Sequence, residues 1–168
     1  NIASLDGKVT LFEGNICDQD LVDKIFNQCN ITRVVHLAAM AGVRFSVENG
    51  PLYTQVNTLG SCILLDAARK YPVSVFVLGS TSSVYGQSAR IPFLEDDAAD
   101  HPLAPYPASK RAAELLAYSY HQIFGLNVTI LRFFNVYGPN GRPDMMPMKV
   151  IESILQEKPI SLFSGGQL

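Results

Sequence analysis

The sequence predicts an α/β protein with a doubly wound parallel sheet in which helices cover the strands. Two observations support this fold class. Short runs rich in β-branched residues alternate along the chain with longer amphipathic stretches, as in β-α-β units. Two of the runs, Val-Val-His-Leu-Ala and Val-Ser-Val-Phe-Val-Leu, are almost continuously apolar, which is expected of strands buried on both faces.

The individual elements follow from these patterns in chain order. We expect four strands, at Val9–Glu13, Arg33–Leu37, Val73–Gly79 and Val128–Phe133. Apolar residues repeating at helical spacing predict four helices, at Asp20–Cys29, Leu52–Lys70, Ala108–Phe124 and Met145–Gln156. Pro107 suits the first position of the third helix, and Asp18 or Asp20 can cap the first. The proline-rich region 91–107 is expected to form a long functional loop.

Composition limits the classes of protein to consider. At 168 residues the chain has room for one domain, or for a piece of one. The net charge of −2 and the lack of a basic cluster argue against nucleic acid as a partner. Three cysteines without C-x-x-C spacing indicate buried thiols in a reducing compartment, not disulfides or a metal site. No stretch reaches the ~20 apolar residues that span a bilayer, and no signal peptide is evident, so a cytoplasmic protein is expected.

The segment Tyr106-Pro107-Ala108-Ser109-Lys110 carries the clearest chemical signal. Four residues separate Tyr106 from Lys110, so on a helix both side chains lie on one face, one turn apart. A neighbouring ammonium lowers the pKa of a tyrosine, which normally titrates near pH ~10, and makes it usable as a base. Thr81, in the preceding Ser/Thr loop, can complete a proton relay. The alternative is an ordinary pair on a helix surface.

Further segments accompany this pair in a fixed order. They are Gly14-Asn15-Ile16-Cys17-Asp18, His36-Leu37-Ala38-Ala39, Asn57 with Gly60, the Ser80–Gly86 loop, and Arg132–Pro139. Together they resemble the extended short-chain dehydrogenase/reductases, the NAD-dependent epimerase/dehydratase family that acts on nucleotide sugars. The resemblance covers the chain from Val9 to its end, and it implies a Rossmann-like fold with NAD as the cofactor.

One expected element of such a fold is absent from this sequence. No glycine-rich turn of the kind that places a pyrophosphate at a helix N-terminus occurs, and the acidic ribose-binding residue is missing too. The resemblance therefore implies an internal fragment, in which residues 1–168 form part of an NAD-binding Rossmann domain and the start of the sugar-nucleotide-binding region. Val9–Glu13 is then expected either to be detached from the sheet or to pair with Arg33–Leu37. The isolated 168 residues are expected to bind NAD poorly and to be inactive.

The resemblance implies catalytic roles for three residues. Tyr106 is the base that removes the proton from the sugar O4 hydroxyl while the C4 hydride passes to nicotinamide. Lys110 supports the phenolate by its charge and binds the nicotinamide ribose, and Thr81 relays hydrogen bonds between sugar and tyrosine. Asn15 replaces a family acid that contacts the adenine amino group, and its carbonyl can still accept that bond. The residues implied to contact the cofactor are Asn15, Ile16, Leu37, Ala38, Ala39, Asn57, Tyr106 and Lys110.

The residues implied to contact the substrate are Arg44, Ser82, Ser83, Asn135 and Arg142. Asn135 matches the position that binds the nucleotide-sugar diphosphate. The segments around Arg44 and Arg142 resemble those of UDP-glucuronate 4-epimerases, and a guanidinium can hold two oxygens of a carboxylate or a phosphate. His36 is expected to be a packed strand residue.

The expected reaction is epimerisation at C4 of a nucleotide sugar, with UDP-glucuronate converted to UDP-galacturonate as the first choice. Family members that eliminate water or carbon dioxide usually carry an extra acid before Val-Tyr-Gly, where this chain has Ser82 and Ser83. The alternatives are a UDP-glucose 4-epimerase, a nucleotide-sugar 4,6-dehydratase, or a non-catalytic remnant that binds a partner. A homodimer formed through Leu52–Lys70 and Ala108–Phe124 is the habit of the family.

Overall fold

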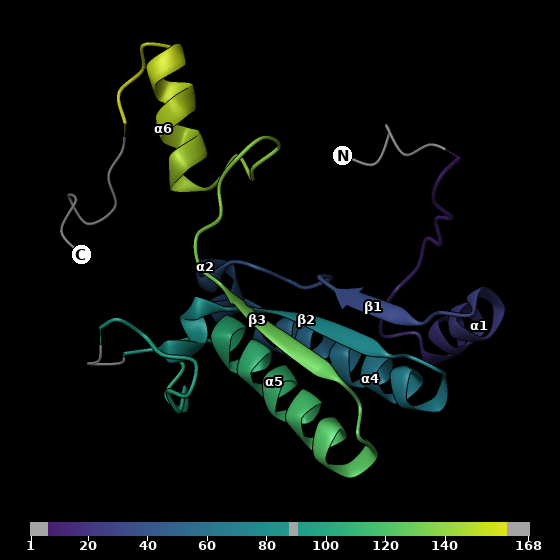
Figure 1. Ribbon diagram of the computed structural model, residues 1–168. Coiled ribbons are helices and arrows are strands. Elements are labelled where there is room, and N and C mark those ends of the chain that lie inside the picture. The colour runs from purple at the N-terminus through teal and green to yellow at the C-terminus, as the bar shows by residue number, and fades with distance from the viewer. Residues whose placement is uncertain (1–6, 88–90, 161–168) are drawn as a thin grey trace. The chain divides into compact units, whose positions relative to one another are not determined.

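The computed structural model describes residues 7–87 and 91–160 and divides the chain into two compact units. The larger unit, Thr10–Phe134, contains all three strands and most of the helices, and it carries the main hydrophobic core. The other unit comprises Asn1–Val9 and Asn135–Leu168, and its helix is α6 (Met146–Leu155). Figure 1 shows the path of the chain from element to element.

The sheet has three parallel strands in the order β1 (Arg33–His36), β2 (Val75–Thr81) and β3 (Val128–Phe133). Val34 pairs with Phe76 across the first ladder, and Leu78 pairs with Ile130 across the second. A helical segment follows β1 and another follows β2, as parallel neighbours require a long crossover. The structure thus confirms three of the four predicted strands and the α/β fold class.

Residues 9–13 form no strand, so the prediction of a strand there is wrong. This segment is exposed, with Leu11 at 74% of its full accessibility, and no ladder partner lies beside it among the described residues. Of the two arrangements expected for it, the structure has the detached one. An extended segment becomes part of a sheet only when its backbone N–H and C=O groups form hydrogen bonds with a neighbouring strand, and this segment has no such neighbour among the described residues.

The helices follow the predicted periods closely. Helix α1 (Gln19–Cys29) begins at Asp18, whose carboxylate accepts from the backbone N–H of Leu21 at 3.0 Å. Helix α5 (Pro105–Phe124) starts three residues earlier than predicted, with Pro105 in its first turn. It ends at Gly125, which takes a left-handed conformation with φ of 68°.

The predicted helix Leu52–Lys70 is one continuous helical segment with three parts. These parts are α3 (Gly50–Tyr53), the π-helical turn η2 (Thr54–Leu59) and α4 (Gly60–Lys70). The short helix α2 (Val43–Glu48) precedes it and was not predicted. Both α2 and η2 pack against α5, so the region after β1 is built onto the helix that carries Tyr106 and Lys110.

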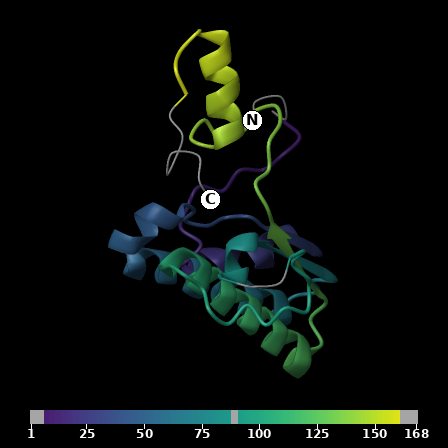
Figure 2. The ribbon, with the colours of Figure 1, turned by 90° about the vertical axis from the view of Figure 1, so that its left-hand side faces the viewer.

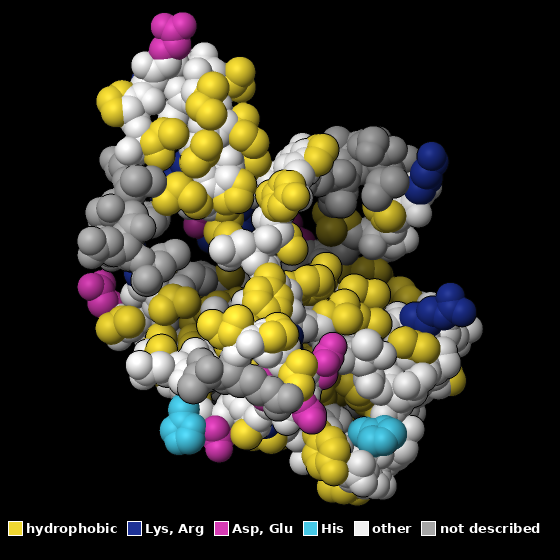
Figure 3. All heavy atoms as spheres, turned by 60° about the vertical axis from the view of Figure 1, so that its left-hand side comes forward, with side chains coloured by type: hydrophobic (Ala, Val, Ile, Leu, Met, Phe, Trp, Pro, Cys, Tyr) yellow, Lys and Arg dark blue, Asp and Glu magenta, His cyan; other side chains and the backbone are white. Residues whose placement is uncertain are grey.

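One face of the sheet carries the core. Helices α1, α4 and α5 meet this face through fully buried residues that include Leu65, Phe76, Leu78 and Ala113, and Figure 1 and Figure 2 show α4 and α5 on the same side of the strands. Val35 on β1 is 66% exposed, and Figure 3 shows hydrophobic side chains at the molecular surface. The expected burial on both faces is therefore not found within the described residues.

Candidate active site

The candidate site lies at the carboxyl edge of the sheet, where ligands bind in open α/β folds. Strand β1 leads into the loop 37–42, and β2 ends at Thr81 and leads into the short 3-10 turn η3 (Ser82–Tyr85). Helix α5 packs against η3 and against η2. This packing brings the ends of β1 and β2 together with the first turns of α5.

Thr81 is buried at the last position of β2. Its side-chain oxygen accepts a hydrogen bond from the backbone N–H of Ser83 at 3.2 Å and so caps η3. The hydroxyl proton is not used in this bond and can be donated to a ligand. Ser82 and Ser83 are half-buried on η3 directly after it.

Tyr106 and Lys110 occupy the first two turns of α5 on one helical face. The ring of Tyr106 is half-buried and packs edge-to-face on Tyr53, with 6.0 Å between ring centroids. Lys110 is only 3% exposed. Among the described residues, no side chain or backbone group forms a hydrogen bond or an ion pair with either the tyrosine hydroxyl or the lysine ammonium. Both polar groups are therefore available to a ligand.

Burial sets the charge behaviour of Lys110. Loss of solvation lowers the pKa of its ammonium from 10.5 to about 8, and the negative charge of Glu114 opposes this shift. The group remains mostly protonated at neutral pH. Buried ammonium groups normally have acceptors, because each carries three donors. The hydroxyl groups of a nucleotide ribose would supply such acceptors, so the site fits NAD at this position.

Asn57, on η2, joins the loop after β1 to α5. Its side-chain oxygen accepts from Met40 N–H at 2.8 Å, and its NH₂ group donates to the Met40 carbonyl at 3.0 Å and to Ser109 Oγ at 2.9 Å. The Ser109 hydroxyl in turn donates to the Tyr106 carbonyl at 2.8 Å. The predicted cofactor residue Asn57 is fully buried, and each of its polar atoms bonds within the protein.

The loop that leaves β1 presents small and apolar residues to solvent. Three predicted cofactor residues are exposed along it: Leu37, Ala38 and Ala39. The hydroxyl of the buried Tyr53 lies 2.8 Å from the Ala41 carbonyl and 2.9 Å from the Gly42 carbonyl, and it fixes the far end of the loop. A flat ligand can therefore lie against this backbone without meeting a large polar side chain.

His36 is a buried strand residue, in agreement with the sequence. The Ser61 hydroxyl donates to the Asn57 carbonyl at 2.5 Å, so it must accept from His36 Nε2, which lies 2.9 Å away. Burial, with a smaller contribution from the charge of Lys110, lowers the pKa of His36 to about 4. The imidazole is neutral at physiological pH and serves packing rather than proton transfer.

The predicted adenine contacts lie before α1. Asn15 is exposed, and its side-chain oxygen accepts from the backbone N–H of Cys17 at 2.9 Å, which closes a local turn. Ile16 is half-buried and covers Gly60, where a Cβ atom would stand only 2.6 Å from Ile16 Cδ1. Asn15 and Ile16 therefore lie in a tight turn that packs against Gly60 at the start of α4.

The predicted substrate residues fall in both units. Arg44 is exposed on α2 in the larger unit. Asn135 and Arg142 belong to the other unit, and both are exposed. Both branches of the Arg142 guanidinium donate to Asp144, with Nε 3.0 Å from Oδ1 and Nη2 2.5 Å from Oδ2. A carboxylate already occupies the fork that was predicted to read a uronate.

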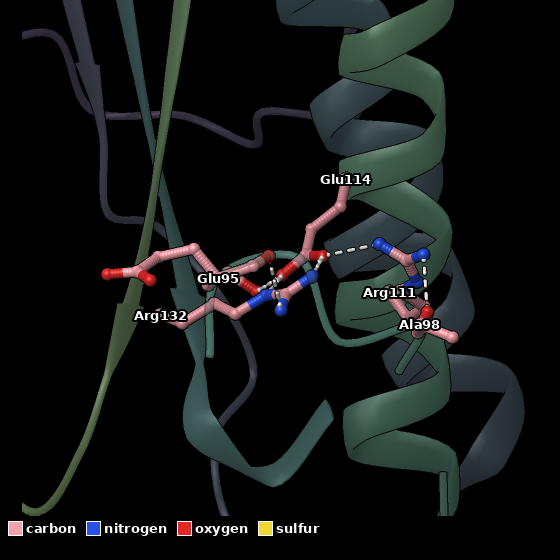
Figure 4. Close-up of polar contacts among 6 residues, drawn as sticks. Glu95, Ala98, Arg111, Glu114 and Arg132 are labelled. Atoms are coloured by element: carbon pink, nitrogen blue, oxygen red, sulfur yellow. Dashed lines mark hydrogen bonds and ion pairs between the residues drawn. The ribbon is translucent and has the colours of Figure 1, made fainter. Parts of the chain in front are cut away.

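Three charged residues that the sequence did not single out form a cluster beside the site. Glu114 on α5 binds Arg111 on the same helix and Arg132 on β3, as Figure 4 shows. The signal was present in the sequence, because Glu114 follows Lys110 by four residues and Tyr106 by eight, which places all three near one helical face. A cavity of about 750 Å³ borders this cluster and is lined by aromatic residues including Tyr85 and Phe93.

Other predicted features have plain structural outcomes. All three cysteines are free thiols, but the expectation that they are buried is wrong, because Cys17 and Cys62 are half-buried and Cys29 is exposed. In the described part of the chain, no group of three or more histidine, cysteine or acidic residues is arranged to hold a metal ion. No helix among the described residues has the length and apolar character needed to cross a bilayer.

The sheet, its crossover helices and the polar groups at its carboxyl edge define a Rossmann-like α/β protein. The chain belongs to the NAD dependent epimerase/dehydratase family, whose model it matches over residues 1–168. It is 46% identical over 156 residues to the UDP-glucuronate 4-epimerase of Thermodesulfobacterium geofontis, a match that covers 92% of this chain and 48% of that protein.

Solved structures agree with this assignment. The UDP-glucose 4-epimerase of Thermotoga maritima with UDP-glucose aligns with a TM-score of 0.91 at 30% identity, over 99% of this chain and 55% of that one. The UDP-glucuronic acid 4-epimerase of Bacillus cereus with UDP-glucuronic acid and NAD aligns with a TM-score of 0.86 at 34% identity, over 98% of this chain and 52% of that one. The chain therefore spans about half the length of these relatives.

Proposed function

We propose that the protein containing this chain is an NAD-dependent UDP-sugar 4-epimerase that interconverts UDP-glucuronate and UDP-galacturonate. The observation that carries this proposal is the buried Lys110 ammonium, which has no acceptor among the described residues and lies one helical turn from the equally unbonded hydroxyl of Tyr106. The names and the complexes of the relatives support the choice of cofactor and sugar.

Each residue of the site has a distinct task in this proposal. Tyr106 removes the O4 proton of the sugar and later returns it, and Thr81 hydrogen-bonds the same oxygen. Lys110 donates to the ribose of the cofactor and stabilises the phenolate by its charge. NAD, when bound, would take up the hydride from C4 and return it to the opposite face. Because the hydride returns, the reaction needs no outside reductant.

The remaining binding residues are proposed from the same resemblance. The adenine and ribose would contact Asn15, Ile16, Leu37, Ala38, Ala39 and Asn57. The nucleotide sugar would contact Arg44, Ser82, Ser83, Asn135 and Arg142. In this proposal residues 1–168 are part of the NAD-binding domain and the start of the sugar-nucleotide-binding region of a cytoplasmic homodimer. The helical segments Leu52–Lys70 and Ala108–Phe124 would pair across its interface.

The first experiment compares two tyrosines of α5. Tyr106→Phe should lower kcat for UDP-glucuronate by about 10²- to 10⁴-fold while calorimetry still detects nucleotide binding, because only the proton-carrying hydroxyl is lost. Tyr118→Phe is the matched control, since Tyr118 is 62% exposed on the same helix. A Tyr106→Phe enzyme with near-normal kcat would remove this residue from the mechanism.

The second experiment tests the substrate. The kcat/KM for UDP-glucuronate should exceed that for UDP-glucose. In this proposal the sugar carboxylate replaces Asp144 on the Arg142 guanidinium when the substrate binds. Arg142→Ala should then reduce the ratio by about ten- to a hundredfold, because a charge-assisted pair contributes roughly 1.5–3 kcal/mol. Equal values in the unaltered protein favour a UDP-glucose 4-epimerase. Formation of a 4-keto-6-deoxy sugar indicates a 4,6-dehydratase, and binding without turnover indicates a non-catalytic protein.

A further inference from the structure

Glu114 is a buried carboxylate with an unusually complete set of hydrogen-bond donors. It is 2% exposed, and it receives four donors (Figure 4). Oε1 accepts from Ser80 Oγ at 2.5 Å and from Arg132 Nε at 3.2 Å. Oε2 accepts from Arg132 Nη2 at 2.9 Å and from Arg111 Nη1 at 2.8 Å. A carboxylate offers about four lone-pair sites, so its acceptor capacity is filled.

These bonds keep Glu114 ionised. Burial by itself raises the pKa of the carboxyl group, but the hydrogen bonds from Arg132, Ser80 and Arg111 outweigh burial and hold the pKa below its ordinary value. A buried carboxylate is stable only when its charge is balanced and its lone pairs are satisfied. Both conditions are met here, and charge-assisted bonds of this kind are short and directional.

The arginines extend the same cluster into the loop after η3. Arg132 lies with its guanidinium 4.8 Å above the ring centre of Tyr85 and donates to the Glu95 carbonyl at 3.4 Å. Arg111 donates to the Ala98 carbonyl at 2.8 Å. Glu114 therefore connects α5 with β3, with η3 and with the 95–98 segment.

The bond to Ser80 has a different consequence, because Ser80 directly precedes Thr81 at the end of β2. The other contacts between α5 and β2 include apolar packing around Ala113 and Leu78, which resists separation but is not directional. The hydrogen bond from Ser80 to Glu114 is directional, and two arginines hold the Glu114 side chain in place. It therefore fixes the distance between β2 and α5 and also the position of one along the axis of the other. A misplacement of about 1 Å in such a site can cost 100-fold in rate.

We propose that Glu114 is a positioning residue that, through Ser80, holds Thr81 in register with Tyr106 and Lys110 on α5. The proposal rests on the function proposed above for these three residues. Glu114 itself has no free lone pair and takes no part in proton transfer. It acts by tying the end of the strand to the helix that carries the base.

The first test measures this tie without any reaction. Amide hydrogen exchange is followed in the complete protein, including any sequence outside these 168 residues. Glu114→Gln should speed exchange across residues 80–85 by about tenfold or more, because the amide presents a donor to groups that are themselves donors. Asp66→Asn is the matched control: Asp66 on α4 binds Arg69 and Lys70 and accepts from Tyr120, and none of these three partners lies on β2. Equal exchange at 80–85 in wild type and Glu114→Gln overturns the proposal.

The second test is a double-mutant cycle in the epimerase assay. Ser80→Ala should lower kcat about tenfold with the KM for the UDP-sugar unchanged within about twofold, as expected for misplacement of Thr81. In a Thr81→Val background, Ser80→Ala should cause no further loss, because the positioned hydroxyl is already gone. A general loss of structure would lower kcat in both backgrounds alike, and that result overturns the proposal. If the unaltered protein epimerises no UDP-sugar, the proposed function fails while the exchange test still decides the role of Glu114.

Discussion

Replacing Lys110 with methionine should stabilise the protein at neutral pH. The ammonium is buried, and its pKa falls from 10.5 in the unfolded chain to about 8 in the fold. Between these values the unfolded chain binds more protons than the folded chain, so stability rises with pH across the window. At 1.36 kcal/mol per pKa unit, the charged group costs the folded state about 3 kcal/mol at pH 7. Methionine is unbranched and fills a similar space without charge.

The measurement is urea-induced unfolding of both forms at pH 7 and at pH 10.5. Lys110→Met should raise the free energy of unfolding by about 2–3 kcal/mol at pH 7. The difference should fall to a few tenths of a kcal/mol, roughly, at pH 10.5, where the wild-type lysine is neutral in the fold and about half neutral in the unfolded chain. One titratable group, the ionised Glu114, offsets part of this shift in the fold, because its negative charge favours the ammonium.

The matched control is Lys70→Met on α4. Lys70 is ion-paired with Asp66 at 2.8 Å, and this bond raises its pKa, so its removal should not stabilise the fold at pH 7. A Lys110→Met protein that is less stable at pH 7, or a gain that persists unchanged at pH 10.5, would refute the reasoning. In the complete protein the same variant should lose the proposed epimerase activity, because a group that costs stability is kept where it serves binding or chemistry.

Three further predictions concern stability. The pKa of His36 is about 4 in the fold against 6.5 in the unfolded chain, so stability should drop by about 3 kcal/mol from pH 6.5 to pH 4, and His36→Gln should remove this drop in urea titrations at both pH values. Asn57→Ala should cost about 2–4 kcal/mol, because it deletes one buried and two partly buried hydrogen bonds. Asn127→Ala, which loses one exposed bond, should cost less than about 1 kcal/mol, and equal losses would contradict the role of Asn57 in joining the loop after β1 to α5. Gly86→Ala should lower the Tm, because φ is 59° there and the new Cβ would lie 2.1 Å from the His101 carbonyl oxygen; an unchanged Tm contradicts this.

Local sequence patterns were sufficient for most of the fold. Helical periodicity predicted α1, α5 and α6 within three residues at each end, and β-branched runs predicted the three strands of the sheet. The same kind of run at 9–13 was misleading, because local composition reports the capacity to be extended but not the presence of a neighbouring strand. The helix α2 was missed for a related reason, since its six residues are too few to show a period.

The residues of the candidate site also fall into two groups: those that spacing within one helix predicts, and those that only the folded chain brings together. The spacing of Tyr106 and Lys110 was enough to place both on one face of α5, because that relation lies within a single helix. Glu114 was not predicted to be buried, since a glutamate on an amphipathic helix is usually a surface residue. Its partners Ser80 and Arg132 lie 34 and 18 positions away in the chain, and only the folded sheet brings them to it.

The π-helical turn at Thr54–Leu59 sets the phase of the helix on either side of it. Each residue of an α-helix turns the chain by about 100°, so the extra residue of a wide turn rotates α3 against α4 by about that angle relative to an uninterrupted helix. Tyr53 can therefore point toward the Ala41 and Gly42 carbonyls while Leu65 faces the sheet. Deleting a single residue within the turn would leave a regular helix. In that helix Tyr53 could not reach the Ala41 and Gly42 carbonyls while Leu65 still packs against the sheet.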